Sequence, residues 1–597
     1  MIQQASISGF RKVEHKVDFC VVGGGIAGMC AAIAAARNGS KTVLIQDRPV
    51  LGGNASSEVR MWIRGSHGEN NRETGLLEEF ALENIYRNPT LNFSIWDSVL
   101  YEKVRFEPNI DLILNCSVCE AEMDGNHIIA VSGWQTTTQT WHYVTADIFA
   151  DCSGDSVLAP LTGAEFRMGR EGRDEFGEDI APAESDNRTM GMSCLIQARE
   201  TPGKSIYTPP VWANRYDKDS LPFRLIPERD RKNWHDTNFW WMELGGMQDS
   251  IHDTEELRDQ LLKVAFGVWD FIKNSGCFEA DNWELDWVGF LPGKRESRRY
   301  VGAHIVTQHD VRTGGHFDDL IAYGGWKMDD HHPAGIETSE QPTIFHPAPA
   351  PFGLPYRCIY SKNIDNLLFA GRNISTTHSA LSSTRVMATC GTLGQAAGTA
   401  AWLCKKYRTL PRDIYSSHIR ELQTILMDDD CYLPFHKREA SSLMKAATIH
   451  APGSNPEILL DGMERNEAEH CHFWSGKPGD TIKISFEQLT QSKTLRIVFD
   501  SDLNRECYSG HDSKIRTYPM ACNIDAGFMP VSVPGTIVRQ FDVTLHGEDG
   551  TCDTIRVDNN YQRLWKMEIP AGISVVDIAL KGTWGSKSVQ VYSVDIY

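Results

Sequence analysis

Long apolar segments are absent from this sequence of 597 residues. No stretch reaches the roughly 18 consecutive apolar residues that a transmembrane helix needs, so we expect no membrane-spanning segment. The opening stretch, MIQQASISGFRKVEHKVDF, lacks the apolar region of a signal peptide. These absences predict a cytoplasmic protein that has no membrane partner.

Blocks of basic residues are absent as well. The sequence has 59 Lys and Arg against 79 Asp and Glu, which gives a formal net charge of −20. Nucleic acids are bound by basic patches, so we expect no nucleic-acid partner.

The 15 cysteines follow no regular spacing. This pattern does not predict a disulfide framework, and free thiols fit a reducing compartment. Cys116 and Cys119 form one CxxC pair, but no second pair stands near them in the sequence. We therefore expect no metal site.

A dinucleotide-binding fingerprint is present near the start of the chain. VDFCVV at 17–22 predicts a buried strand, GGGIAG at 23–28 supplies the GxGxxG pattern, and MCAAIAAARNG predicts a helix that ends near Gly39. Glycines in this strand–turn–helix order let backbone N–H groups approach a pyrophosphate. We assign this site to Gly23, Gly25, Ile26, Ala27 and Gly28.

The residues after the second strand, KTVLI, depart from the usual fingerprint. An acid is expected about 20 residues beyond the glycines, but Gln46 stands there and Asp47 follows it. A carboxamide can also hydrogen-bond a ribose hydroxyl, although more weakly than a carboxylate. We expect Gln46 and Asp47 to contact a ribose; a solvated strand end is the alternative.

Three later stretches favour FAD over NAD as the cofactor. LGGNASS at 51–57 adds a second glycine pair, which a longer cofactor needs for close backbone approach. ADIFADCSGDSVLAPLTGAEF at 146–166 predicts an apolar strand with a polar end. NLLFAGRNISTTHSALSSTRVMATCGTLGQAAGTAAWL at 366–403 predicts a strand, a turn, a loop and a helix from about Cys390. The N-terminus of such a helix would stabilise the negative charge of reduced flavin.

These stretches resemble the FAD-dependent oxidoreductases of the glutathione-reductase-like Rossmann type. Within that group they resemble a bacterial family often encoded beside polysaccharide-degrading enzymes. The resemblance rests on GGGIAG, RPVLGGNASSEVR, DCSGDSVLAPLTGAEFR, LPGKRESRRYVGAHIVTQHDV, DDHHPAG and AGRNISTTHSALSSTRVMATCGTLGQAAG, and it spans about residues 17–430. It implies that Gln46, Asp47 and Arg48 surround the adenosine ribose. It also implies further cofactor contacts at Gly52, Gly53, Asn54, Ser57, Gly154, Asp155, Gly371, Arg372, Gly391, Leu393 and Gly394.

The sequence predicts an α/β Rossmann-type FAD-binding domain with an inserted α+β cap domain, followed by an all-β sandwich. We place the FAD-binding domain at 1–165 and 286–440, the cap at 166–285 and the sandwich at 450–597. A helix is expected at ELRDQLLKVAFGVWDFIKN in the cap, where Trp269 lies on the apolar stripe.

Short alternating runs from TIKISFE to VQVYSVDIY predict the strands of the sandwich. The sandwich resembles galactose-binding-like domains, which often bind sugars. A packing or dimerisation module is the alternative, and a homo-oligomer stays open.

Candidate catalytic groups are histidines and arginines near the predicted cofactor. His67 follows the second glycine pair, and His331 and His332 lie in an expected polar loop, DDHHPAG. His378 and Arg385 resemble in position the His and Arg near the flavin of succinate dehydrogenase and fumarate reductase flavoproteins. Arg60 is a further candidate. Each of these residues has a structural alternative, as a satisfied core histidine or an ion-pair arginine.

The expected function is hydride transfer between FAD and a small polar substrate. We expect oxidation of a hydroxyl-bearing carbon in a carbohydrate-derived molecule, a sugar or a sugar acid. Two alternatives are a fumarate-reductase-like enoate reductase and a carbohydrate-binding protein with a structural flavin. No second dinucleotide fingerprint is evident in the sequence, which leaves the electron acceptor unknown.

Overall fold

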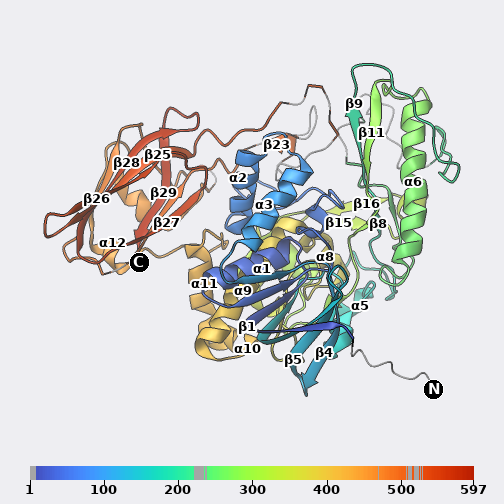
Figure 1. Cartoon of the computed structure of the whole chain (residues 1–597), viewed down its shortest axis with the longest axis horizontal. Helices are drawn as coiled ribbons and strands as arrows, with labels where there is room; N and C mark the ends of the chain where they lie inside the picture. The colour runs from blue at the N-terminus through green and yellow to red at the C-terminus, as the bar shows by residue number, and fades with distance from the viewer. Residues whose placement is uncertain are drawn as a thin grey trace.

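The structure is a computed structural model. It describes residues 9–597 apart from 221–233, 235–237, 468–469, 492, 506, 509–513, 516–522, 525 and 528. No helix within these described ranges is both long and apolar enough to cross a membrane. Figure 1 shows a central α/β region, a region around the long helix α6 (Thr254–Asn274) on one side, and a β region at the C-terminus on the other.

The central region is built on a seven-stranded sheet. Its parallel strands are β3 (Ile110–Ile113), β2 (Thr42–Ile45), β1 (Arg11–Val22), β6 (Thr140–Asp151) and β18 (Leu367–Phe369), and its antiparallel strands are β5 (His127–Gln135) and β4 (Cys116–Asp124). The carboxyl ends of β1, β2, β6 and β18 meet at one edge. Open α/β sheets bind ligands at such an edge.

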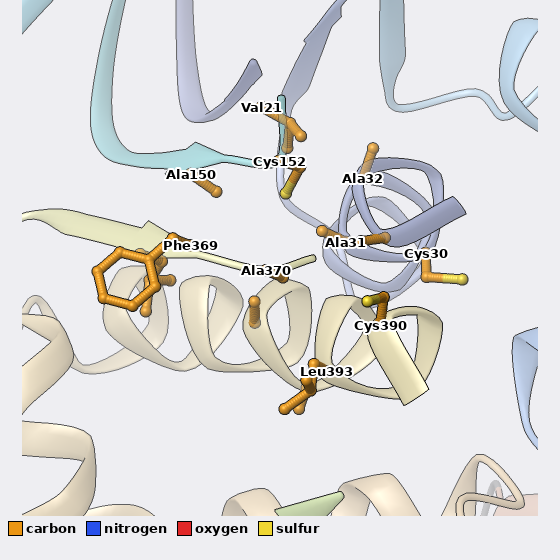
Figure 2. Close-up of a cluster of buried hydrophobic side chains, with 14 of the residues drawn as sticks. Val21, Cys30, Ala31, Ala32, Ala150, Cys152, Phe369, Ala370, Cys390 and Leu393 are labelled. Carbon is orange, nitrogen blue, oxygen red and sulfur yellow. The ribbon is translucent and has the colours of Figure 1, made fainter. Parts of the chain in front are cut away.

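Two helices from distant parts of the chain pack very closely beneath this edge. The helices of the central region are α1 (Ile26–Arg37), α2 (Leu76–Arg87), α3 (Phe93–Arg105), α8 (His378–Thr384), α9 (Met387–Tyr407) and α11 (Ile419–Asp428). A Cβ at Gly394 of α9 would lie 2.1 Å from the carbonyl oxygen of Ala27 in α1. Only glycine therefore fits there. Figure 2 shows Ala31 of α1 beside Cys390 and Leu393 of α9.

Helix α8 corrects one prediction from the sequence. The sequence predicts a loop between the Ala-Gly-Arg turn and a helix that begins near Cys390. The structure instead has a helix at His378–Thr384, and α9 begins at Met387. Ser and Thr are modest helix formers, so the composition of α8 hid it. Burial of all its residues and the cap from Thr377, whose hydroxyl accepts the N–H of Ala380, stabilise the helix.

The region around α6 contains one long helix and several short strands; its bounds as a cap domain stay a prediction. Its strands are β8 (Met192–Ser193), β9 (Ile196–Glu200), β10 (Glu243–Leu244), β11 (Trp283–Val288) and β12 (Gly293–Lys294). The predicted helix is confirmed as α6, and its apolar stripe is buried at Leu261, Leu262, Ala265, Val268, Trp269 and Ile272. Trp269 is therefore a core residue, in contact with Trp234.

A short strand beside the cap corrects a second prediction. The sequence predicts a polar loop at DDHHPAG, but Met328–His331 form β15, which pairs with β16 (Thr343–His346). Successive side chains of a strand point to opposite faces. Asp329 and His331 therefore share one face of β15, and Asp330 occupies the other. Because polar residues lie on both faces of β15, the sequence shows no alternation of apolar and polar residues that would predict a strand here.

The C-terminal region is a sandwich of two antiparallel sheets. One contains β19 (Thr448–His450), β21 (Thr481–Ser485), β28 (Ile573–Thr583), β25 (Val538–Gly547) and β26 (Cys552–Val557); the other contains β20 (Trp474–Gly476), β29 (Val589–Ile596), β22 (Lys493–Phe499) and β27 (Leu564–Ile569). The alternating runs predicted as strands are confirmed at β21, β22, β25, β27, β28 and β29.

Buried ion pairs join the sandwich to the central region. We call this group the junction cluster: Asp428, Asp430, Arg438, Glu464, Arg496, Arg563 and Asp595. Arg496 donates to Glu464 and to the carbonyl oxygens of Met427 and Asp428, at 2.7 Å in the last case. Each charge of the cluster thus has an opposite partner.

A single arginine extends the junction towards the N-terminal region. Arg465 donates to the carbonyl oxygens of Asn70, at 2.7 Å, and Arg72, at 3.3 Å. It also donates to the hydroxyl of Thr74 and lies 3.7 Å from the ring centroid of Tyr432. The segment at 70–74 is therefore held from the C-terminal side of the chain.

Candidate active site

A cavity of about 620 Å³ lies where β1, β2, β6 and β18 end. Its lining residues form two groups. The glycine-loop side includes Gly23, Gly25, Ile26, Ala27, Gln46, Asp47, Arg48, Gly52, Gly53, Asn54, Gly154, Asp155, Gly371 and Arg372. The β15 side includes Met61, Trp62, Arg64, Asn238, Trp240, Arg295, Trp326, Asp329, His331, Phe345 and Arg385. The structure thus brings together most of the residues that the sequence assigns to a cofactor.

The glycine loop presents bare backbone to this cavity. Gly25 precedes α1, and no side chain caps that helix. A Cβ at Gly25 would come within 4 Å of only one atom, the Cα of Gly53 at 3.9 Å. Uncapped N–H groups at a helix N-terminus suit an anion such as a pyrophosphate.

Gln46 and Asp47 have different roles next to the loop. Gln46 is 2% exposed; its Oε1 accepts the N–H of Gly24 at 2.7 Å, and its Nε2 donates to the carbonyl of Val50 at 3.2 Å. The Asp47 side chain is 62% exposed and lies 3.7 Å from Arg48. Gln46 therefore braces the glycine loop, and Asp47 is the acid available to a ligand.

A charged triad stands on the same side of the cavity. Asp155 accepts from Arg372 at 2.7 Å, from Lys294 at 2.8 Å and from the hydroxyl of Ser297 at 2.8 Å. Burial raises the pKa of Asp155, but Arg372 and then Lys294 hold it well below its ordinary value of 3.8. The buried Nε of Arg372 has no hydrogen-bond partner among the described residues.

Five residues assigned to the cofactor do not line the cavity. The N–H of Ser57 instead donates to Asp97 at 3.0 Å. A Cβ at Gly28 would lie 1.9 Å from the carbonyl oxygen of Gly23, so Gly28 supports the loop from behind. The other three, Gly391, Leu393 and Gly394, lie in the interior of α9. Cofactor contact at these five positions stays a prediction.

His331 and Asp329 form the centre of the β15 side. The Nδ1 of His331 lies 2.6 Å from Glu243, and its Nε2 lies 3.2 Å from Asp329. Arg385 approaches Asp329 at 3.3 Å, and Arg295 lies 3.8 Å from Glu243. Burial raises the pKa of Asp329, but His331 and then Arg385 and Arg295 lower it overall. Two acids, two arginines and one imidazole therefore balance each other in a buried cluster.

Some polar atoms on the β15 side lack a hydrogen-bond partner among the residues that the structure describes. They are Asn238 Oδ1, Trp326 Nε1 and Arg385 Nε, together with Asp329 Oδ1 and His331 Nε2, which face each other at 3.2 Å. Each is buried, and each belongs to a residue that lines the cavity. Buried polar groups are nearly always hydrogen-bonded, so a group of such atoms around a cavity is typical of a binding site.

His378 lies outside the cavity, behind β15. Its Nδ1 lies 2.9 Å from Glu296, and its Nε2 lies 3.1 Å from Asp330. Burial lowers the pKa of His378, but Glu296 and Asp330 raise it to about 10. At this pKa, His378 stays protonated near neutral pH, and its ring lies outside the cavity lining, so it is not available as a base to a ligand there.

The other candidates predicted from the sequence also lie away from the cavity lining. Arg60 donates to Gln197, and its guanidinium lies 4.2 Å from the Trp287 ring. His67 is exposed and stacks on Trp326 at 4.4 Å. His332 accepts the N–H of Ala334 at 3.2 Å. Of the six candidates, the structure brings His331 and Arg385 to the cavity.

Several site residues were missed in the sequence. Asp329 and Glu243 carried no motif, although the i, i+2 spacing of Asp329 and His331 becomes informative once β15 is known to be a strand. Lys294 and Arg295 stand in GKRESRR, a stretch that by itself indicates no ligand. Among the residues that the structure describes, no group of three His, Cys, Asp or Glu side chains could hold a metal ion.

The glycine-loop side fits FAD. The uncapped α1 suits the pyrophosphate, Asp47 suits a ribose, and Arg372 offers a buried unpartnered donor. The family model described as FAD dependent oxidoreductase matches residues 18–426. No curated protein matches the chain.

Among solved structures, similarity is partial. A geranylgeranyl bacteriochlorophyll reductase-like protein of Thermoplasma acidophilum is 12% identical, with 70% of this chain and 85% of that chain covered and a TM-score of 0.30. The myxobacterial chondrochloren halogenase CndH, an FAD-dependent halogenase, is 14% identical, with 32% of this chain and 46% of that chain covered and a TM-score of 0.22. The family 32 carbohydrate-binding module of Streptococcus pneumoniae EndoD is 13% identical, with 26% of this chain and 99% of that chain covered and a TM-score of 0.19. Similarities of this size identify no substrate.

Proposed function

The chain belongs to the family of FAD-dependent oxidoreductases, and from that premise we propose that it oxidises a hydroxyl-bearing carbon of a small carbohydrate-derived molecule. The observation that carries this proposal is the His331 imidazole, placed between two carboxylates at the wall of the cavity. Oxidation of an alcohol removes a hydride from carbon and a proton from oxygen. Such a site needs a base close to the cofactor.

FAD, when bound, supplies the two-electron oxidation. The residues that would hold it are those of the glycine-loop side: the backbone at Gly23 and Gly25, the Asp47 carboxylate, and the Arg372 guanidinium beside Asp155. Lys294 shares Asp155 with Arg372 and keeps that carboxylate ionised.

The proposed base is His331 Nε2. In this proposal the neutral ring carries its proton on Nδ1, which donates to the Glu243 carboxylate at 2.6 Å. The lone pair is then on Nε2 at the cavity wall, where it would accept the substrate hydroxyl, and Arg385 offsets the charge of the neighbouring Asp329. When Nε2 takes the hydroxyl proton, the imidazolium lies between Glu243 and Asp329, which stabilise its charge.

The other residues of the β15 side orient the substrate. Arg385 and Asp329 form an ion pair at 3.3 Å. The Nε of Arg385 offers the substrate a hydrogen-bond donor, and the Oδ1 of Asp329 offers it an acceptor. The rings of Trp240, Trp326 and Phe345 supply apolar walls that limit water around the reacting carbon.

The test is an anaerobic screen of the purified holoenzyme with neutral sugars, glycosides and uronates. We expect at least one compound to bleach the oxidised flavin absorbance, because hydride transfer reduces the flavin. Bleaching by none of them, together with turnover of an enoate by the chemically reduced enzyme, would replace this proposal with an enoate reductase. Glycan binding that persists after FAD removal, without any turnover, would support a binding protein with a structural flavin.

A further inference from the structure

We propose that the substrate is a neutral polyhydroxylated molecule, a sugar or glycoside without a carboxylate or an amine. This inference rests on the proposed function and narrows it. The partnerless atoms of the β15 side carry the argument because they include both hydrogen-bond donors and hydrogen-bond acceptors.

The donors and acceptors are interspersed among residues from different elements. Arg385 Nε and Trp326 Nε1 can only donate, whereas Asn238 Oδ1 and the ionised Asp329 Oδ1 can only accept. His331 Nε2 accepts when the ring is neutral. A ligand that satisfies the whole set must itself donate at some points and accept at others.

Hydroxyl groups meet this requirement, since each is one donor and two acceptor lone pairs. A carboxylate only accepts, so it would serve Arg385 and Trp326 and leave Asp329 and Asn238 facing negative charge. An ammonium group only donates and would leave the two donors unsatisfied. Leaving a buried polar group unpaired is costly, so a site of this kind rejects both.

The two arginines beside Asp329 and Glu243 lead to the same conclusion. Arg385 is already paired with Asp329 at 3.3 Å. Arg295 donates to Ser193 at 3.0 Å and to the Trp240 carbonyl at 2.7 Å, and it lies 3.8 Å from Glu243. Neither arginine therefore offers an uncompensated charge to an acidic substrate.

Aromatic rings complete the site. Trp62, Trp240, Trp326 and Phe345 line the same part of the cavity. The guanidinium of Arg64 lies 5.0 Å from the ring centroid of Trp62 and 5.8 Å from that of Trp326. Flat apolar walls with polar atoms between them suit a sugar ring, whose C–H faces are apolar and whose rim is hydroxylated.

The experiment titrates the oxidised holoenzyme with matched hexoses of gluco, galacto and manno configuration. Each is offered in its neutral, uronate and 2-amino form, and binding is read from the flavin difference spectrum. We expect one neutral hexose to bind at least about 10-fold more tightly than the uronate and the amino sugar of the same configuration, because one unpaired buried group costs that much. A uronate or amino sugar that binds as tightly, or the absence of any response to neutral hexoses, overturns the inference.

The same titration separates this inference from the proposed function. The neutral hexose could bind more tightly than the uronate and the amino sugar and yet never bleach the flavin under anaerobic conditions. In that case neutral sugars are the ligands of the cavity, and the proposed oxidation is wrong. If bleaching occurs best with a uronate, the oxidation stands and the neutral class fails.

Substitution Asp329→Asn sharpens the test. It removes the carboxylate that compensates Arg385, so the affinity for the uronate should rise about 10-fold relative to the neutral hexose. The exposed Asn274→Leu, on α6 outside the cavity lining, is the control and should leave both affinities unchanged. An unchanged preference in Asp329→Asn would mean that charge compensation does not set the selectivity.

Discussion

Two buried groups of charges in this molecule differ in how completely they are paired. In the junction cluster, Arg496, Arg563 and Arg438 each meet a carboxylate, and no buried polar atom of the cluster lacks a hydrogen-bond partner. On the β15 side of the cavity, Asp329, His331 and Arg385 are equally buried, but each retains a partnerless atom.

This difference separates a structural role from a binding role. Both groups have the residue types that suggest chemistry when read from sequence, and burial alone does not distinguish them. A fully paired cluster has nothing left to offer a ligand, and its charges fix one arrangement of the chain. A cluster with open positions beside a cavity is arranged for a molecule that completes it.

The largest expected effect comes from breaking the paired cluster. Arg496→Met leaves Glu464 buried without its main partner, and removing one partner of a buried pair costs about 3–5 kcal/mol of unfolding free energy. The urea midpoint measured by circular dichroism should fall accordingly. Lys581→Met, in the exposed pair with Asp542, is the control, with an expected loss of about 0–1 kcal/mol. Equal losses in the two variants would contradict the comparison.

Breaking the open cluster should affect the rate more than the stability, because Arg295 and Arg385 remain beside the two carboxylates that His331 contacts. His331→Asn removes the proposed base, so flavin reduction by the substrate should slow on the order of 10²–10³-fold in stopped-flow measurements. The urea midpoint should change far less than in Arg496→Met. His332→Asn, one residue along and outside the cavity, should reduce flavin at the normal rate. A normal rate in His331→Asn would remove this residue from the mechanism.

A pH series of melting temperatures tests whether His378 has a structural role, like the charges of the junction cluster. Its pKa is raised from 6.5 to about 10, so the charged form stabilises the folded state. That contribution is complete below pH 6.5 and is lost as the pH rises towards 10. The melting temperature of the holoenzyme should therefore fall across this window, and His378→Asn should show a flatter profile. The same slope in both proteins would exclude the His378 contribution.

The smallest effects are expected on FAD affinity at Gln46 and Asp47. Gln46 is buried and hydrogen-bonded at both ends of its amide, whereas the neighbouring Asp47 side chain is largely exposed. Gln46→Leu leaves the N–H of Gly24 unpaired, so the dissociation constant of FAD should rise about 10-fold. Asp47→Ala removes an exposed acid and should raise it only about 3-fold. Both values follow from flavin fluorescence during dilution. A larger effect at Asp47 would mean that the contact of Asp47 with FAD contributes more to affinity than the support that Gln46 gives to the glycine loop.

The sequence is most informative where local order dictates chemistry. The glycine loop, the strands around it and the alternating runs of the sandwich follow from patterns within a few residues, and FAD follows from their order. The β15 side depends on distant contacts: Glu243, Asp329 and Arg385 meet only when the cap folds back onto the sheet. His378 shows the limit most clearly, because its position in the chain resembles a flavin-side histidine, whereas two distant carboxylates make it part of the support.

Arg465 is synthesised long after the segment near the cavity that it holds in place. It donates to Thr74, which is 391 residues earlier in the chain. At about 5–20 residues per second, a ribosome needs roughly 20–80 seconds to cover that distance. Until then the segment at 70–74, which follows the wall residues Trp62 and Arg64, lacks the hydrogen bonds that Arg465 donates to it. The cavity lining itself extends from Val22 to Cys390 along the chain, so FAD that meets the nascent chain early meets an unfinished pocket.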